Sequence, residues 1–511
     1  MSDIQIKIEK IKTLMIVVLL ITAILLLSFF WRGLSLDDLR SISVVNNENR
    51  YKPQVSELVV PEYLKVGVGS DGYTIFDPEH HMLNVDGNIQ DVTLYNKFIN
   101  IIKDYLEQDD ISAEKIEKSQ YHEIMAHASM SAEFAFKVPF REYIRKNGIS
   151  LSGNVSPIED MTTITLSPFS SENLFVIDRS SGNYYRIAIN NDNFSKTMAT
   201  SLNELITSLN KSASSSYYAI KDVTGADNDR MIPIYMKSYM QQIPYNLEFS
   251  ISERSDIIAT ENTFFSDGMD FVRRITENKG SLIYVFGLNE KVLTLHENGQ
   301  ISYTEEFDSS SYEEQNLYET VETAIEYISL HGGWKSISEV GGDVYLKDVS
   351  RIFECDGKYG GYRLVFGTKV RGVPLEYDKG NVISLKICGS QVISYEREII
   401  QPDVSNLNSE EWEAAAPLDI LTVNYRTLYD TIISEENNQT DEADNNIIEN
   451  EEKKFDYVMS NIDNIEFCMY RNTESGEELI SPKWIIEVKN IIFRFEPKEG
   501  NLEGYTVIED D

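Results

Sequence analysis

The chain has 511 residues, of which 42% are hydrophobic and 25% are charged, and this globular mixture excludes a disordered or collagen-like protein. Its formal net charge of −37 argues against nucleic acid as a main partner, because phosphate binding requires a basic surface. Three cysteines in so long a chain exclude a disulfide-dense scaffold. The length predicts about three domains.

The N-terminal segment predicts a single membrane span. Residues 13–31 are an uncharged run of 19, long enough to cross a hydrocarbon core of about 30 Å as a helix. Three lysines lie in residues 1–12, which favours a cytoplasmic N-terminus, and no signal-peptide cleavage site follows the span. We therefore expect the bulk of the chain to be extracytoplasmic. The side chains expected to contact the membrane are Leu14, Val18, Ile21, Leu25 and Phe29.

Beyond the span, the pattern predicts a stalk and three α+β domains. We place the stalk at 32–59, an N-terminal domain at 60–235, a central domain at 236–400 and a C-terminal domain at 401–511. The expected fold class is α+β: an elongated multidomain ectodomain of antiparallel sheets, each packed with one or a few helices.

Apolar spacing in the first domain predicts helices at 92–106 and 195–210. In the second domain, Ser311 with Glu314 reads as a capping box that starts a helix, and a glycine pair ends it. A further helix is expected at 418–433. Strands are expected at 132–140, 173–179, 183–190, 281–287, 291–296, 300–307, 362–370, 381–388, 391–399, 464–470, 483–490 and 491–497. The acidic run 435–453 reads as a solvated loop, and 336–348 as irregular.

Several runs of residues resemble known binding motifs for dinucleotides, zinc or calcium, but their spacing or their neighbouring segments do not fit such sites. The run 67–72 matches G-x-G-x-x-G but leads into a strand-like segment, so it reads as a turn between strands rather than a dinucleotide site. His122 and His127 are five residues apart, which a regular helix does not bring to one zinc ion. The acidic residues of 222–229 fit no EF-hand, so calcium is the minor alternative to a plain turn. We expect no catalytic residue, no cofactor and no metal site.

The cysteines also do not indicate a catalytic site. Cys355, Cys388 and Cys468 fall in or near expected strands, and each is interpreted as an unpaired residue that fills space in a core rather than as a nucleophile.

Short motifs in the second half resemble those of the YycH family of bacterial membrane-anchored regulators. The run 327–334 reads YISLHGGW; a G-V-P strand start and a Y-x-R strand follow it, and an S-P-K-W strand comes near the end. The closing part is also similar to YycI and PepSY-type domains. The residues that carry the resemblance, expected to be structural, are Gly332, Gly333, Trp334, Gly372, Pro374, Tyr395, Arg397, Pro482 and Trp484.

The resemblance implies an accessory protein of the WalK/WalR (YycG/YycF) two-component system. Such a protein would bind a sensor histidine kinase, possess no enzymatic activity and tune cell-wall metabolism, with a YycI-like chain as a possible second partner. The alternative is an anchored envelope enzyme or a PepSY-like protease inhibitor; a hydrolase would show a cleft with convergent carboxylates or a metal.

Overall fold

The computed structural model describes residues 52–508 except 69–71, 79–81, 86–87, 110, 152, 213–216, 235, 266–270, 279, 335–341, 356–358, 407–409, 440–447, 449 and 474–477. The expected span at 13–31, with its five membrane-contact residues, lies outside this range. No helix within the described residues combines the length and the apolar character that a membrane crossing requires.

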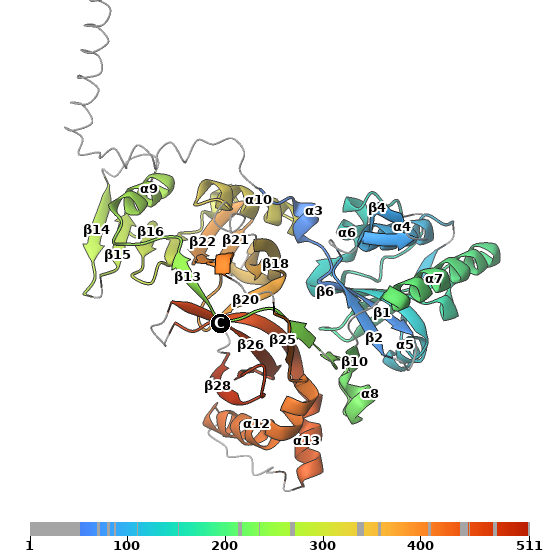
Figure 1. The fold of residues 1–511 in the computed structure, drawn as a ribbon. Helices are drawn as coiled ribbons and strands as arrows, with labels where there is room; N and C mark the ends of the chain where they lie inside the picture. The colour runs from blue at the N-terminus through green and yellow to red at the C-terminus, as the bar shows by residue number, and fades with distance from the viewer. Residues whose placement is uncertain are drawn as a thin grey trace, which may run out of the picture.

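The described chain forms three lobes (Figure 1). The first, here called the N-terminal lobe, contains a nine-stranded sheet in the order β11-β10-β2-β1-β6-β7-β8-β9-β5. Its strands are β1 (Tyr63–Val68), β2 (Tyr73–Phe76), β5 (Ser112–Ile116), β6 (Ala128–Pro139), β7 (Asp160–Leu166), β8 (Asn173–Asp178), β9 (Asn183–Ala188), β10 (Tyr217–Ala219) and β11 (Met231–Pro233); β3 (Met82–Val85) and β4 (Asn88–Thr93) form a separate hairpin.

Helices cover both faces of this sheet. The helices of the lobe are α3 (Val55–Leu58), α4 (Leu94–Leu106), α5 (Lys118–Met125), α6 (Phe140–Lys146), α7 (Asp192–Ser212) and α8 (Ile220–Thr224). Every residue of β8 is buried, with Leu174 and Val176 in the core that also contains α4 and α7, and Phe175 and Ile177 beside α5. Alternate side chains of a strand point to opposite faces, so α5 covers the face opposite α7.

The middle lobe packs one long helix on an antiparallel sheet. Its elements are α9 (Arg254–Phe264), β14 (Val272–Thr276), β15 (Leu282–Phe286), β16 (Lys291–Leu295), β17 (Ile301–Glu305), α10 (Leu317–Leu330), β18 (Gly342–Cys355), β19 (Tyr359–Val370), β20 (Val373–Tyr377), β21 (Ile383–Cys388) and β22 (Gln391–Arg397). Helix α10 buries the expected apolar stripe against β19 and β21.

Two expectations for this lobe are wrong. Asn316 rather than Ser311 caps α10: its side chain accepts from the Glu319 N–H while the Glu319 carboxylate accepts from the Asn316 N–H. The region expected to be irregular contains the start of β18. A bulge between Leu346 and Asp348 shifts the phase of the buried residues there, so the alternation typical of a strand is interrupted.

The C-terminal lobe packs two helices on a second group of strands. Its elements are β24 (Trp412–Ala414), α12 (Pro417–Gln439), α13 (Glu451–Ser460), β25 (Ile462–Arg471), β26 (Leu479–Val488), β27 (Ile491–Phe495) and β28 (Leu502–Val507); β13 (Ile243–Leu247) and β23 (Ile400–Pro402) join its sheet through β26. The acidic run 435–453, expected to be a loop, is helical at both ends, because α12 extends to Gln439 and α13 begins at Glu451.

The three lobes are joined by strand pairing and buried contacts. Strands β20 and β25 run parallel and merge the sheets of the middle and C-terminal lobes into one of 15 strands. Strand β12 (Met236–Ser238) pairs with β24. From the N-terminal lobe, α3 and β6 contact β18, and buried Asn228 donates two hydrogen bonds, to the carbonyls of Met459 and Ile462.

The cysteines differ from expectation at one position. Cys388 is disulfide-bonded, so its interpretation as an unpaired residue is wrong; the strand register that brings sulfur atoms together is not visible in the spacing of cysteines. Cys468 is free and buried.

Candidate functional site

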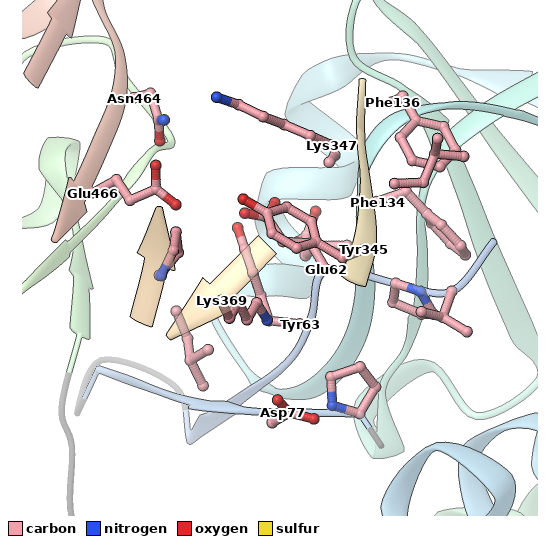
Figure 2. A pocket seen from close by; sticks show the side chains of 18 of the residues that line it. Glu62, Tyr63, Asp77, Phe134, Phe136, Tyr345, Lys347, Lys369, Asn464 and Glu466 are labelled. Atoms are coloured by element: carbon pink, nitrogen blue, oxygen red, sulfur yellow. The ribbon is translucent and has the colours of Figure 1, made fainter. Parts of the chain in front are cut away.

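A cavity of about 620 Å³ lies where the three lobes meet, and we call it the junction cavity. The N-terminal lobe contributes Glu62 and Tyr63 at the start of β1, with Arg230 before β11. The other lobes contribute residues of β18, β19, β25 and β26, among them Tyr345, Lys347, Lys369, Glu466 and Glu487. Figure 2 shows that Glu62, Tyr345, Lys369 and Glu466 approach the cavity from different strands.

Irregular strand registers shape the wall of this cavity. The register of β6 against β7 jumps between Glu133 and Val138, and the side chains of the intervening Phe134 and Phe136 line the cavity. Strand β18 has its bulge beside Lys347, and β25 has one beside Asn464. Bulges redirect side chains away from regular alternation, so strands of both large sheets can present side chains to this space.

The wall carries more acidic than basic side chains. The side chains of Glu62, Glu466 and Glu487 make no hydrogen bond or ion pair with the described residues, whereas Lys347 pairs with Glu376 outside the wall. Burial among protein atoms disfavours an isolated negative charge unless a partner compensates it. The cavity therefore contains carboxyl groups whose charge is poorly compensated.

Because these carboxyl groups have few partners, their pKa values are raised. Burial raises the pKa of Glu466 to about 8, with the neighbouring Glu376 adding to the shift and Lys347 opposing it. Burial also raises the pKa of Glu62, against the effect of Lys369 and Arg230. The pKa of Glu487 is raised by burial and then by Asp463. A cavity with these groups can take up protons or accept a cationic group near neutral pH.

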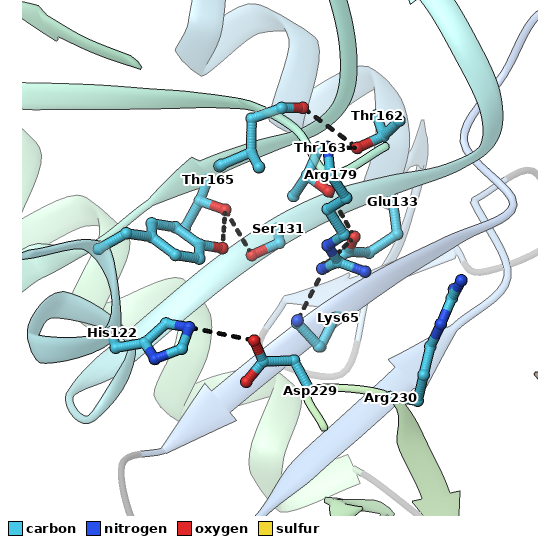
Figure 3. A network of polar contacts seen from close by, with 12 residues as sticks. Lys65, His122, Ser131, Glu133, Thr162, Thr163, Thr165, Arg179, Asp229 and Arg230 are labelled. Carbon is cyan, nitrogen blue, oxygen red and sulfur yellow. Dashed lines mark hydrogen bonds and ion pairs between the residues drawn. The ribbon is translucent and has the colours of Figure 1, made fainter. Parts of the chain in front are cut away.

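A second set of charges lies in the N-terminal lobe beside the junction cavity (Figure 3). The Glu133 carboxylate lies 2.7 Å from Lys65 Nζ and 2.7 Å from Arg179 Nη2, and it accepts from the Thr163 hydroxyl. Burial alone would raise the pKa of Glu133, but Arg179 and Lys65 outweigh burial and lower it to about 2. Arg179 lines the junction cavity, so this cluster forms part of its wall.

Five of the motif residues named from the sequence lie at or near the end of α10. Gly332 has a φ of +111°, and a Cβ there would lie 2.8 Å from Arg397 Nε. The Arg397 guanidinium donates two hydrogen bonds of 2.7 Å to Glu248, and the Tyr395 hydroxyl donates to the His331 carbonyl. The Trp334 indole donates to Ser329, and its ring is 1% exposed. Gly333, with a φ of +74°, completes the turn.

The other motif residues lie apart from that cluster. Gly372, with a φ of +80°, forms the turn between β19 and β20, and Pro374 of β20 lines the junction cavity. Pro482 and Trp484 both lie in β26, where the Trp484 ring packs edge-on against Phe467 at 5.3 Å between centroids.

The motifs set aside in the sequence do not converge on a metal. His122 contacts Asp229 at 3.0 Å, whereas His127 stacks on Phe169 at 3.6 Å between ring centroids. Asp229 of the acidic 222–229 run faces Lys118, Lys221 and His122. Within the described parts of the chain, no three His, Cys, Asp or Glu side chains are arranged to hold a metal ion. The 67–72 run joins β1 to β2, as expected for a turn between strands.

Sequence reasoning did not find the junction cavity. Its walls come from segments more than four hundred residues apart, from Glu57 to Glu487, and no motif links them. The available signal was weak: a single charged residue, such as the buried Glu133, within a strand that otherwise reads as apolar.

Comparison with solved structures identifies the fold. The crystal structure of YycH from Bacillus subtilis matches with a TM-score of 0.50 over 89% of this chain and 97% of that chain, at 12% sequence identity. The chain has a YycH-like fold. The match spans all three lobes, so the resemblance seen in the second half of the sequence extends to the architecture of the N-terminal lobe. The sequence matches no family profile and no curated protein.

Proposed function

We propose that this YycH-like protein is a membrane-anchored extracytoplasmic regulator that binds and modulates a sensor histidine kinase of the WalK (YycG) type. The observation that carries the proposal is the fold match to YycH along 89% of this chain and 97% of that one. A match of this extent concerns the arrangement of all lobes rather than one common domain.

The placement of the motif residues supports the proposal. Arg397 contacts Gly332 and Tyr395, Tyr395 donates to the His331 carbonyl, and Trp334 donates to Ser329, so these residues fasten β22 and the turn to the end of α10. Their contacts stabilise the lobe, which supports a structural role for the motifs.

Two features support an anchored, extracytoplasmic location. The uncharged run at 13–31 is preceded by three lysines and followed by the acidic bulk of the chain. The disulfide at Cys388 suits an oxidising compartment, because thiols are kept reduced in the cytosol.

In the proposed mechanism, the anchor packs beside the kinase helices and the lobes favour one of two kinase conformations. The resulting bias equals the difference in contact free energy between the two conformations and cannot exceed it. A YycI-like chain would add contacts to the same assembly.

Co-purification of the kinase with the tagged full chain tests the proposal. We expect the kinase to be recovered with the wild-type chain, and its recovery to fall when 13–31 is replaced by an unrelated apolar helix of equal length. Unchanged recovery of the kinase after the replacement would indicate that the lobes, not the anchor, form the interface. Absence of the kinase from both samples would contradict the proposal.

A deletion strain provides the second readout. We expect transcripts controlled by the kinase to change on deletion and to return with the wild-type chain. Catalytic turnover by the purified lobes, abolished by Glu466→Gln in the junction cavity, would instead favour the alternative of an anchored envelope enzyme.

A further inference from the structure

A small pocket between α5, the sheet of the N-terminal lobe and the α8–β11 segment has an unusual charge for so acidic a chain. It has a volume of about 170 Å³, and its charged wall residues are Lys65, His122, Arg179, Lys221 and Asp229. We propose that this pocket, here called the α5 pocket, binds a small oxyanion, either a phosphate group or a carboxylate.

The charges at the α5 pocket do not balance. Lys65 and Arg179 share one carboxylate, that of Glu133, while Lys118, Lys221 and His122 share that of Asp229, and Lys118 also pairs with the exposed Asp227. Three carboxylates thus face four permanent cations and a histidine. In a chain whose formal net charge is −37, this is a local excess of positive charge that an anion would neutralise.

Lys65 has hydrogen-bonding capacity that the protein does not use. The residue is 5% exposed, and its neighbours Leu64 and Val66 point into the core on the other face of the sheet. An ammonium group has three N–H donors, yet Glu133 is the one polar side chain within ion-pair distance of Nζ among the described residues. Burial lowers the pKa of Lys65 against the opposing effect of Glu133, and the ammonium group also lies 5.3 Å from the centroid of the Tyr73 ring.

The rest of the wall suits an oxyanion. Tyr73 and Tyr184 line the pocket, and phenolic hydroxyls can donate to an anionic oxygen; Tyr121 also lines it, but its hydroxyl is hydrogen-bonded to Thr165. The side chains of Lys221, His122 and Arg179 are 28%, 27% and 30% exposed, whereas Lys65 is buried, so an anion from solvent can reach the pocket beside the first three residues. Figure 3 shows that Lys65, His122 and Arg179 lie near Asp229.

Anion binding in the α5 pocket would affect a segment that also contacts the C-terminal lobe. Lys221 and Asp229 lie on the segment whose Asn228 donates hydrogen bonds of 2.8 and 2.9 Å to two carbonyls of that lobe. Ile220 and Ile232 of the same segment are buried in the core formed by α12 and α13. An anion that repositions Lys221 therefore acts on a segment held by both lobes.

Titration of the full chain in detergent with inorganic phosphate or acetate, at constant ionic strength set with chloride, tests the inference. We expect saturable binding with one site per chain. Lys221→Gln should weaken it at least about tenfold, because a charge-assisted hydrogen bond is lost. Lys221→Arg should retain binding. Lys237→Gln, which removes an exposed lysine paired with Glu411 away from the pocket, should leave it unchanged.

Asp229→Asn provides a test that damage to the fold cannot imitate. It removes the carboxylate that competes for Lys221 and His122, so we expect anion binding to tighten several-fold. Binding of phosphate alone would identify a phosphoryl group as the ligand, and binding of both anions a general oxyanion site. The inference would be overturned if phosphate and acetate bound no more strongly than chloride does. Equal affinity of wild type and Lys221→Gln for these anions would also overturn it.

Discussion

Substitution of Gly332 by alanine should destabilise the middle lobe through a specific collision. The backbone φ of +111° disfavours any side chain, at a cost of about 1–3 kcal/mol. The new Cβ would also lie 2.8 Å from Nε and 2.9 Å from Cζ of Arg397. That guanidinium cannot move freely, because Arg397 is 1% exposed and holds Glu248 through two hydrogen bonds.

Gly372→Ala is the matched control for the backbone contribution. Gly372 has a φ of +80°, and a Cβ there would meet nothing within 4 Å. Breaking a buried ion pair costs about 3–5 kcal/mol, and a partial displacement of Arg397 costs a fraction of that. We therefore expect Gly332→Ala to lower the free energy of unfolding by about 2 kcal/mol more than Gly372→Ala does.

Urea unfolding followed by tryptophan fluorescence measures this difference, since Trp334 lies beside the turn. In an Arg397→Met background the collision partner is shortened, and the cost of Gly332→Ala should fall to that of Gly372→Ala. Equal costs for the two alanines in the wild-type background would refute the reasoning. So would an unchanged cost of Gly332→Ala in the Arg397→Met background.

Three further outcomes are expected. The pKa of Glu466 is raised from 4.5 to about 8, so the protonated side chain contributes its full stabilisation below about pH 4.5 and loses it as pH rises through 8. In urea titrations, the free energy of unfolding of Glu466→Gln should therefore rise by about 2–4 kcal/mol relative to wild type between about pH 5 and 9. Parallel curves for the two proteins would contradict this. Alkylation of the denatured, unreduced chain should label one of the three cysteines, Cys468, and labelling of Cys388 as well would argue against the disulfide. Asn228→Ala removes two buried hydrogen bonds and should lower the free energy of unfolding by about 2–4 kcal/mol. Amide hydrogen exchange should become faster at the junction of α13 and β25 but not in β7, and uniform acceleration would indicate general unfolding instead.

Local patterns in the sequence predicted much of the secondary structure. The helices α4, α7 and α10 each bury a stripe of apolar residues, and that periodicity is visible without tertiary information. The hairpin of β16 and β17 was equally clear, because an Asn-Gly pair separates two alternating runs. The start of α10 was misplaced because a second, equally good cap, Asn316 with Glu319, follows Ser311 by five residues.

The site depends on long-range pairing that local patterns do not encode. Glu466 and Lys347 are ordinary charged residues within strands until β20 pairs with β25 and brings them to one cavity. The rejected motifs illustrate the same point: His122 and Asp229 were judged separately in the sequence, yet they contact each other at the α5 pocket. The membrane-contact residues remain predictions, since they precede the described chain.

Under the proposed topology, the parallel pairing of β20 with β25 would have a consequence for export. If the part of the chain after the anchor crosses the membrane in sequence order, β20 emerges long before β25, and the edge of β20 that pairs with β25 stays uncovered in the meantime. An exposed sheet edge of that kind can recruit a strand from another molecule. The nascent protein is thus most vulnerable to aggregation after Tyr377 has emerged and before Arg471 has followed, the interval in which a periplasmic or wall-associated chaperone would be of most use.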